Sequence, residues 1–308
     1  MRKTIVDQRM KEVMAYTEIR PARPEDRDAV LAFCRSTWEW GDYIEYVWDE
    51  WLHDEQGLLF VATVDGQPVA IDHLKMLNAT DAWLEGMRVD PAHRRHGIAS
   101  ALNTALMAEA MKRGATRVRL ITESTNTNSI SIIERGHFRR VGAYALYRAR
   151  PEAAATRQRY GMDRPQQATK ADLDDIIDYL NASNIFPSTG GLYYHSFVAY
   201  TITAELIERK IADQHVYILR RWDRLDGLAI AEPRLSERQG DQLSIGYIDG
   251  TTESIGLIAY FLRHHVLDLE LDHVVAYVPD LMMVRDAFTG AEYEWDGSIF
   301  YTYERGLE

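Results

Sequence analysis

The sequence contains a single cysteine, Cys34, among its 308 residues. One cysteine cannot form a disulfide within the chain, and it is typical of proteins from a reducing compartment. Long apolar runs are also missing: no stretch approaches the length of a membrane span, and the first residues lack the apolar core of a signal peptide. We therefore expect a cytoplasmic protein with no membrane partner. Cys34 follows Phe33 in an expected helix, which favours packing over use as a nucleophile.

A surplus of basic residues is absent as well. Lysine and arginine number 35 against 47 aspartates and glutamates, which gives a formal net charge of −12 at pH 7. Such a chain has no excess positive charge to neutralise phosphates, so nucleic acid is not expected as a partner. The acidity is compatible with cationic or amine-bearing ligands, although it more often only favours solubility. The length favours two domains, and 46% hydrophobic residues are typical of a globular protein.

The most informative stretch is 83–113, where a strand, a basic loop and a helix follow one another. Residues 83–89 alternate imperfectly between apolar and polar around a glycine, as a strand does, and Asp90-Pro91 stops the strand because proline cannot donate to a ladder. The basic loop 93–97 then leads into a helix with apolar residues at helical spacing and Gly114 just past its end.

This order of elements predicts a binding site for a pyrophosphate. A helix N-terminus presents backbone N–H groups without internal partners and about half a unit of positive charge. Gly97 lets an anion approach the backbone closely, and Arg94 and Arg95 add full charges beside it. A basic loop alone is usually a solvated turn, but here the spacing Arg94-x-x-Gly97-x-Ala99 falls between a strand and a helix.

The segment resembles the acetyl-CoA signature of the GCN5-related N-acetyltransferases (GNAT), whose pattern is Arg/Gln-x-x-Gly-x-Gly/Ala after a strand. Arg94, Gly97 and Ala99 match it position by position, and the resemblance covers residues 17–148 well and the rest more faintly. It implies acetyl-CoA as co-substrate. The residues that the resemblance assigns to acetyl-CoA are the backbone of Met87 and Val89, together with Arg94, Arg95, His96, Gly97, Ile98, Ala99, Ser100 and Asn126. For Asn126 the alternative is a plain helix cap.

The reaction that the resemblance implies is direct attack of an amine on the thioester of acetyl-CoA. Glu85, on the strand before the loop, is the expected proton acceptor, acting directly or through water; the alternative is a solvent-facing strand glutamate. The family's thiolate-protonating tyrosine falls at Ile133, which cannot donate a proton. That role is vacant or taken over by Tyr144, Tyr147, His137 or water.

The segment 38–51, WEWGDYIEYVWDEW, holds four of the seven tryptophans, two tyrosines and five carboxylates. One interpretation is an aromatic face packed on the sheet. The other is an acceptor pocket wall, because aromatic rings with carboxylates suit a cationic amine. The predicted acceptor residues are Trp38, Asp42, Tyr43 and Tyr46. The segment also resembles, more weakly, histidine N-acetyltransferase-like proteins, which hints at an amino acid as acceptor.

The second half of the chain repeats the first weakly, which predicts a duplicated fold. We expect an α+β protein of two tandem GNAT-like lobes, each a mixed, mostly antiparallel sheet flanked by helices, at 1–150 and 169–308 with a linker at 151–168. The first lobe is expected to end in strands at 138–141 and 143–149. The second copy has two acids and no arginine in residues 249–256, which would repel a pyrophosphate. Its expected role is structural, as a wall or an interface, with a homodimer as one arrangement.

Three functions remain open from the sequence. The leading one is acetyl transfer to the amine of a small molecule. The alternatives are a non-catalytic acyl-CoA-binding or sensing protein, suggested by Ile133, and a protein lysine acetyltransferase, to which the acidic surface would attract basic peptides. His93, His96 and His137 do not have the spacing of a ligand set, so no metal is expected.

Overall fold

The chain folds into strands and helices that form two compact units. The computed structural model describes residues 17–35, 37, 41–151, 163–236 and 238–307. Within them the chain forms two units, one made of 17–120, 128–139 and 303–307 and the other of 121–127 and 140–302. The boundaries predicted from the sequence stay a prediction, and 152–162 of the predicted linker lie outside the described residues.

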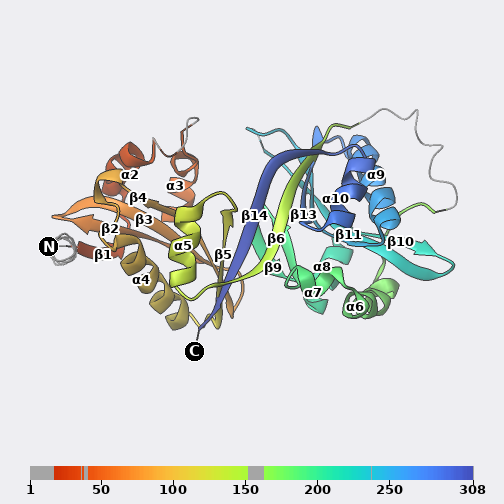
Figure 1. Cartoon of the computed structure of the whole chain (residues 1–308), viewed down its shortest axis with the longest axis horizontal. Helices are drawn as coiled ribbons and strands as arrows, with labels where there is room; N and C mark the ends of the chain where they lie inside the picture. The colour runs from red at the N-terminus through yellow and green to blue at the C-terminus, as the bar shows by residue number, and fades with distance from the viewer. Residues whose placement is uncertain (1–16, 36, 38–40, 152–162, 237, 308) are drawn as a thin grey trace. The chain divides into compact units, whose positions relative to one another are not determined.

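The first unit is built on a five-stranded run in the order β1-β2-β3-β4-β5, antiparallel except for β4 and β5, which are parallel (Figure 1). Its elements are β1 (Thr17–Pro21), η1 (Pro24–Asp26), α2 (Arg27–Cys34), α3 (Ile44–Leu52), β2 (Gly57–Val64), β3 (Gln67–Met76), β4 (Asp81–Val89), η2 (Pro91–His93), α4 (Ile98–Lys112), β5 (Arg117–Glu123) and α5 (Thr127–Arg135). The hairpin turn at Asp65-Gly66 has positive φ at both residues, which is the usual conformation of this dipeptide in a two-residue hairpin.

Helices cover both faces of these strands. Leu59, Val61 and Ile71 belong to one buried cluster with the apolar residues of α2 and α3, including Cys34, which is 2% exposed as expected. Helix α4 packs on β2, β3 and β4, and Figure 1 shows it on the other side of the strands from α2 and α3. Because successive strand residues point to opposite faces, the hairpin β2–β3 is buried on both of them.

The second unit contains a sheet of order β14-β6-β13-β12-β11-β10-β7 and a separate hairpin, β8–β9. Its elements are β6 (Arg139–Ala149), β7 (Gln166–Gln167), η4 (Lys170–Asp172), α6 (Leu173–Ala182), α7 (Ile185–Ser188), β8 (Leu192–His195), β9 (Val198–Thr201), α8 (Ala204–Ala212), β10 (Val216–Arg221), β11 (Arg224–Arg234), β12 (Gln242–Gly250), α9 (Thr252–Asp268), β13 (His273–Pro279), α10 (Met282–Gly290) and β14 (Glu294–Gly306). Val216 and Ile218 pack with α6 and α8, whereas Tyr217 and Leu219 pack with α9.

The end of the first lobe differs from the sequence prediction. Residues 138–149 were expected to form two strands, but 139–149 form the single strand β6, because the backbone stays extended through Gly142. This strand pairs with β13 in the second unit, where Tyr144 lies opposite Pro279 and Ala149 opposite Val274. The last described residues, 303–307, belong instead to the first unit, where the N–H of Leu307 donates to the carbonyl of Thr116.

A buried ion-pair row ties the C-terminal residues into the first unit. The Arg119 guanidinium on β5 donates from Nη1 to Asp81 Oδ2 on β4 at 3.0 Å and from Nε to Glu304 Oε2 at 2.8 Å. The side chains of Arg119 and Asp81 are only 2% and 3% exposed. Asp81 also pairs with the more exposed Arg117 at 2.8 Å. Removing the buried Arg119 would therefore leave buried carboxylates only partly compensated, which costs more than the row contributes when intact. No helix within the described residues has the length and apolar content of a membrane span.

Replacing Arg119 should therefore destabilise the first unit. We expect Arg119→Met to lower the free energy of unfolding by about 2 kcal/mol, because Asp81 and Glu304 lose the buried guanidinium and, of its two arginine partners, Asp81 keeps only Arg117, at 2.8 Å. The control is Arg139→Met: Arg139 contacts the same Glu304 at 3.5 Å but is 80% exposed, so its loss should cost less than about 0.5 kcal/mol. Urea unfolding followed by far-UV circular dichroism measures both. Equal losses in the two variants would contradict this reading of the row.

Candidate active site

Strand β4 carries a bulge where the sequence places Gly86. Across the hairpin, Ile71 lies opposite Arg88 and His73 opposite Glu85, so the single residue Asp72 faces the two residues between them. Gly86 has φ +82°, a left-handed conformation that side chains rarely adopt. A Cβ at this position would also lie 2.4 Å from the Trp51 ring. Only glycine fits here, for both reasons.

The bulge coincides with the end of pairing between β4 and β5. In the described part of the chain, the parallel ladder covers Asp81 to Trp83, where Trp83 lies opposite Arg119. The later residues of β4, including Met87 and Val89, are half-buried and lie beyond that ladder. Backbone groups at such an edge suit an extended ligand that pairs as a strand does. The assignment of Met87 and Val89 to the pantetheine arm stays a prediction.

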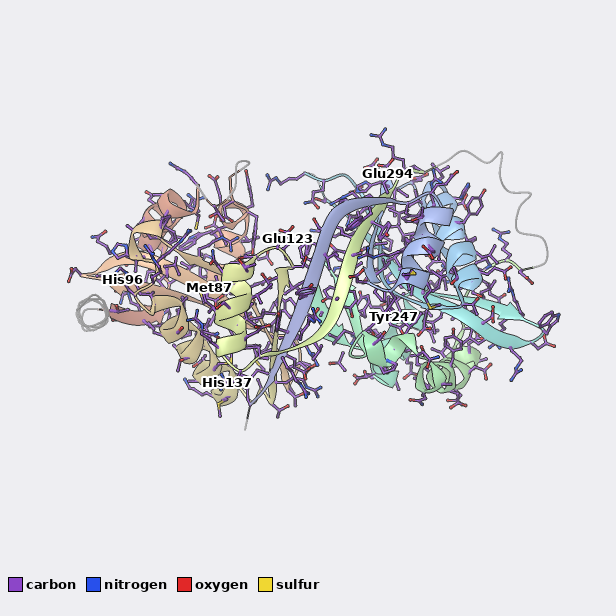
Figure 2. All side chains as sticks on the ribbon, in the orientation of Figure 1. Met87, His96, Glu123, His137, Tyr247 and Glu294 are labelled. Atoms are coloured by element: carbon purple, nitrogen blue, oxygen red, sulfur yellow. The ribbon has the colours of Figure 1, made fainter. Side chains whose placement is uncertain are left out.

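The loop between β4 and α4 forms hydrogen bonds within itself and with the end of β4. The Asp90 carboxylate accepts from the N–H of Ala92 at 2.9 Å, and Arg94 Nε donates to the carbonyl of Val89 at 3.1 Å. The His96 ring, labelled in Figure 2, contacts the carbonyl of His93 through Nδ1 at 3.1 Å. These contacts join the loop to itself and to the end of β4.

Backbone conformation then turns the loop into the helix. Arg95 and Gly97 both have positive φ, at +67° and +85°. Gly97 is the N-cap of α4 and has no side chain with which to cap the first N–H groups, and the first turn contains no acidic residue. The other residues predicted for pyrophosphate binding lie as follows: Arg94 and Ser100 are exposed, His96 and Ala99 half-buried, and Ile98 buried, so that Ile98 presents only its backbone. The arrangement fits an anion with two or more oxygens.

The equivalent helix start in the second unit is filled by protein groups. The Thr251 hydroxyl caps α9 by accepting from the N–H of Ser254 at 3.1 Å. Glu253 lies in the first turn and pairs with Arg221 of β10 at 2.8 Å, and the same guanidinium lies 3.7 Å from Asp226. The sequence predicted the acids but missed Arg221, because β10 precedes α9 by some thirty residues. This loop already has internal partners for its charges.

Glu85 lies next to a buried histidine that the sequence reasoning missed. Glu85 Oε1 is 3.1 Å from His73 Nδ1; the Glu85 side chain is 24% exposed and the His73 side chain 0%. The Trp51 ring stacks on the imidazole, with centroids 4.6 Å apart and planes 8° from parallel. The signal that could have found His73 is the hairpin register, because a turn at Asp65-Gly66 followed by a second turn near residue 79 brings the middles of 67–76 and 81–89 together.

The predicted acceptor residues do not all lie together. Asp42 is buried, and its carboxylate accepts from Arg88 Nε at 2.7 Å and from Arg88 Nη2 at 3.1 Å, so it is engaged by protein rather than open to an amine. The Arg88 guanidinium carbon lies 5.2 Å from the centroid of the Tyr43 ring. Burial raises the pKa of the Tyr43 hydroxyl to about 12. Tyr46 is 55% exposed, and Trp38 lies outside the described residues.

The residues proposed around the leaving thiolate have specific positions. Ile133 is buried on α5, and Asn126 is exposed just before that helix. The Tyr144 hydroxyl donates to the carbonyl of Thr189 at 2.9 Å, and Tyr147 is buried. Burial raises the pKa of the Tyr147 hydroxyl. His137 is exposed with φ +61° just after α5. Among the described residues, no group of three or more His, Cys, Asp or Glu side chains could hold a metal ion.

Comparison with known proteins identifies the fold. Residues 19–138 match the model of the acetyltransferase (GNAT) family. The chain is similar to a GCN5-related N-acetyltransferase from Sphaerobacter thermophilus, with TM-score 0.59, 13% identity and coverage of 94% of this chain and 96% of that one. It is also similar to an acetyltransferase candidate from Thermoplasma acidophilum, with TM-score 0.58, 16% identity and coverage of 94% of this chain and 100% of that one. No curated protein matches the sequence significantly.

A third structure supports the two-lobed form. The chain is similar to a tandem GNAT protein from the clavulanic acid biosynthesis pathway, with TM-score 0.52, 13% identity and coverage of 94% of this chain and 98% of that one. At these identities the likeness concerns the fold. The predicted α+β architecture of two tandem GNAT-like lobes is confirmed.

The buried carboxyl of Asp72, beside the bulge, makes stability depend on pH. Burial raises the pKa of Asp72 well above its ordinary range, and the His73 N–H bond and the charge of Arg88 offset this only in part. Above about pH 4 the unfolded chain releases this proton while the folded chain keeps it, so the free energy of unfolding falls by about 1.4 kcal/mol per pH unit until the folded-state value is reached.

We therefore expect Asp72→Asn to stabilise the protein more at pH 8 than at pH 5. The asparagine oxygen can still accept from the N–H of His73, at 3.1 Å from the present carboxylate oxygen, but carries no charge to desolvate. Urea unfolding at both pH values measures the difference. Asp65→Asn, in the exposed β2–β3 turn, is the control and should shift neither value. A pH dependence unchanged by Asp72→Asn would show that this carboxyl is not the source.

Proposed function

We propose that the protein transfers the acetyl group of acetyl-CoA to the amine of a small molecule, with an amino acid as the favoured class, because residues 19–138 match the model of the acetyltransferase (GNAT) family. The transfer proceeds by direct attack in a ternary complex. One observation carries the proposal. The bulged strand β4 is followed by the loop Arg94-x-x-Gly97-x-Ala99 and then by helix α4, whose first N–H groups have no side-chain cap because the N-cap residue is Gly97.

The first unit, rather than the second, is proposed to bind acetyl-CoA. In the first unit, the N–H groups at the start of α4 have no side-chain cap, and Arg94 and Arg95 are exposed beside them. In the second unit, the helix start already holds the Arg221–Glu253 pair. An anion entering the second loop would have to displace a capping hydroxyl and meet two carboxylates. The groups proposed to hold the pyrophosphate are Arg94, Arg95, His96 and the backbone of Gly97, Ile98, Ala99 and Ser100, with Asn126 as a further contact.

Bound acetyl-CoA supplies a thioester carbonyl as the electrophile. The backbone of Met87 and Val89 is proposed to pair with the pantetheine arm and to donate a hydrogen bond to the carbonyl oxygen, on which negative charge develops. Glu85 is proposed to accept a proton from the acceptor, because an alkyl ammonium has a pKa of about 10 and is mostly protonated at neutral pH. Its position, partly exposed on the strand before the loop, supports this role.

The acceptor side is proposed to lie around α3 and the bulge of β4. Tyr43 supplies an uncharged aromatic wall, and the bidentate Asp42–Arg88 pair fixes its position. We therefore propose that Asp42 acts by orienting Arg88 rather than by contacting the amine. Tyr46 and Trp38 are proposed as outer contacts of the acceptor. The proposal of an amino acid rests on the weak resemblance of the segment 38–51 to histidine N-acetyltransferase-like proteins.

The proposed pyrophosphate site can be tested by CoA binding. We expect Arg94→Ala combined with Arg95→Ala to weaken CoA binding about a hundredfold, because each lost charge-assisted hydrogen bond is worth about 1.5 kcal/mol or more. Both side chains are exposed, so the melting temperature should stay within about 2 °C. Isothermal titration calorimetry on the full chain measures the affinity. Arg35→Ala, an exposed arginine after α2, is the control; unchanged binding in the double variant would refute the site.

The proposed reaction can be tested by thiol release from acetyl-CoA with a panel of amines and amino acids. We expect Glu85→Gln to lower kcat/KM by about a hundredfold or more while leaving CoA affinity unchanged, because only the proton acceptor is lost. The matched control is Glu18→Gln, an exposed strand glutamate on β1, which should retain activity.

Two results would replace the proposal. CoA binding without thiol release for any amine would favour the binding or sensing function, and release only with lysine-containing peptides would favour protein acetylation.

A further inference from the structure

The side chain of Arg88 turns back to the backbone of its own strand, β4. Arg88 Nη1 donates to the carbonyl of Met87 at 3.0 Å, while Nε and Nη2 donate to the two carboxylate oxygens of Asp42 at 2.7 and 3.1 Å. All three guanidinium nitrogens therefore have partners within the protein. The side chains of Arg88 and Asp42 are 14% and 3% exposed, so the pair belongs to the interior of the first unit.

The carbonyl of Met87 lies on the edge of β4 that faces away from β3. The N–H of Asp90 donates to the carbonyl of Val69 on β3, so the backbone of Asp90 faces β3. Because the backbone groups of successive strand residues point alternately to the two sides, those of Val89 and Met87 face the opposite edge. On this edge β4 continues beyond its ladder with β5.

The carbonyls of Met87 and Val89 each have an arginine partner, but the two arginines are held differently. Arg94 Nε donates to the carbonyl of Val89 at 3.1 Å from an exposed side chain in the loop. Arg88 is held by Asp42 in the interior. Burial opposes the charge of Arg88, but the hydrogen bonds to Asp42 outweigh burial, so the pKa of Arg88 is raised and its guanidinium stays charged.

The third bond of Arg88 gives the ion pair a direction. An ion pair that only joined the chain before α3 to β4 would not need a bond to the Met87 carbonyl. Because the guanidinium is planar, its Nη1 corner points away from the two nitrogens that meet Asp42. The pair is therefore a dipole whose positive end covers an oxygen of the strand edge and whose negative end lies behind it.

We propose that Arg88 is a positioning residue of acetyl transfer, which acts through Met87 so that this part of the edge presents hydrogen-bond donors in a positive field. The thioester oxygen that accepts from the N–H of Met87 gains negative charge as the amine attacks. An uncovered Met87 carbonyl would oppose that charge, and Arg88 removes the opposition. The inference rests on the proposed function, because it states how the backbone of Met87 is prepared for acetyl-CoA.

The transfer step balances without a further reactant. Glu85 takes the first proton of the acceptor ammonium, and the amine nitrogen then bonds to the carbonyl carbon while the π electrons move to the oxygen. The electrons return as the C–S bond breaks and CoA leaves. The second proton of the amine reaches the departing sulfur through water. Arg88 exchanges no proton in this step, and its contribution is to the charge on the oxygen.

The test compares two variants of the full chain that share one substitution. Asp42→Asn keeps Arg88, whereas Asp42→Asn with Arg88→Gln replaces the ion pair by two amides and leaves no unpaired buried charge. With the best amine of the panel, we expect kcat of the double variant about tenfold below that of Asp42→Asn. This is less than the loss of a direct donor costs, because Arg88 acts through the backbone.

Binding of CoA should not follow the same order. CoA has no thioester oxygen, so its affinity, measured by calorimetry, should differ by less than about twofold between the two variants. The control is Arg35→Met, which removes an exposed arginine after α2 and should retain the wild-type kcat.

A second measurement needs no turnover. Infrared difference spectra with an isotope label on the thioester carbonyl carbon report how strongly the site polarises that bond. Binding to the wild-type chain should move the carbonyl stretch to lower frequency than in solution, and Asp42→Asn should keep this displacement. The double variant should lose about half of it or more. An ion pair with only a structural role would leave the displacement unchanged in a folded variant.

Both effects are required. An active wild-type enzyme for which the double variant matches Asp42→Asn in kcat, or in carbonyl frequency, would overturn the inference alone. If the double variant does not fold, Asp42→Leu with Arg88→Met replaces it in both measurements, because apolar replacement of a buried ion pair is often neutral for stability. A wild-type chain that acetylates no amine would overturn the proposed function and the inference with it.

Discussion

The left-handed conformation of Gly86 in the middle of β4 is the constraint on which the first unit's site depends. It inserts one extra residue opposite Asp72, so Glu85 meets His73 while the strand beyond runs past its ladder with β5. It also removes the Cβ that would collide with Trp51, and Trp51 in turn stacks on His73. A single backbone conformation thus sets the edge offered to a ligand and the surroundings of the proposed proton acceptor.

The two units share one scaffold and differ in how they treat the start of their long helix. In the first, Gly97 leaves the first N–H groups of α4 without a side-chain cap, and the adjacent arginines point their charge outward. In the second, Thr251 and the Arg221–Glu253 pair satisfy the start of α9 internally. The start of α4 therefore offers N–H groups to an anion, whereas the start of α9 already has protein partners.

Strand β3, which pairs with β4, buries two polar side chains beside the proposed site. Asp72 and His73 are fully buried polar groups on adjacent positions of β3, where a strand between two helical layers would ordinarily carry apolar residues. No ion pair between described residues neutralises Asp72, and burial favours the neutral form of its carboxyl. His73 instead has a carboxylate at each ring nitrogen. The Asp42–Arg88 pair brings two further charges into the same layer in compensated form.

The sequence by itself determined the elements whose causes are local: the Asp65-Gly66 hairpin, the strand–loop–helix around Arg94 and Gly97, and the doubled α+β plan. It located Glu85 on the correct strand. Tertiary structure decided what depends on partners distant in the chain. Four features join segments that no local pattern connects: the pairing of Asp42 with Arg88, the filling of the second helix start by Arg221, the pairing of β6 with β13, and the return of residues 303–307 to the first unit. Periodicity reports which face a residue occupies, whereas register and long-range pairing decide what it meets there.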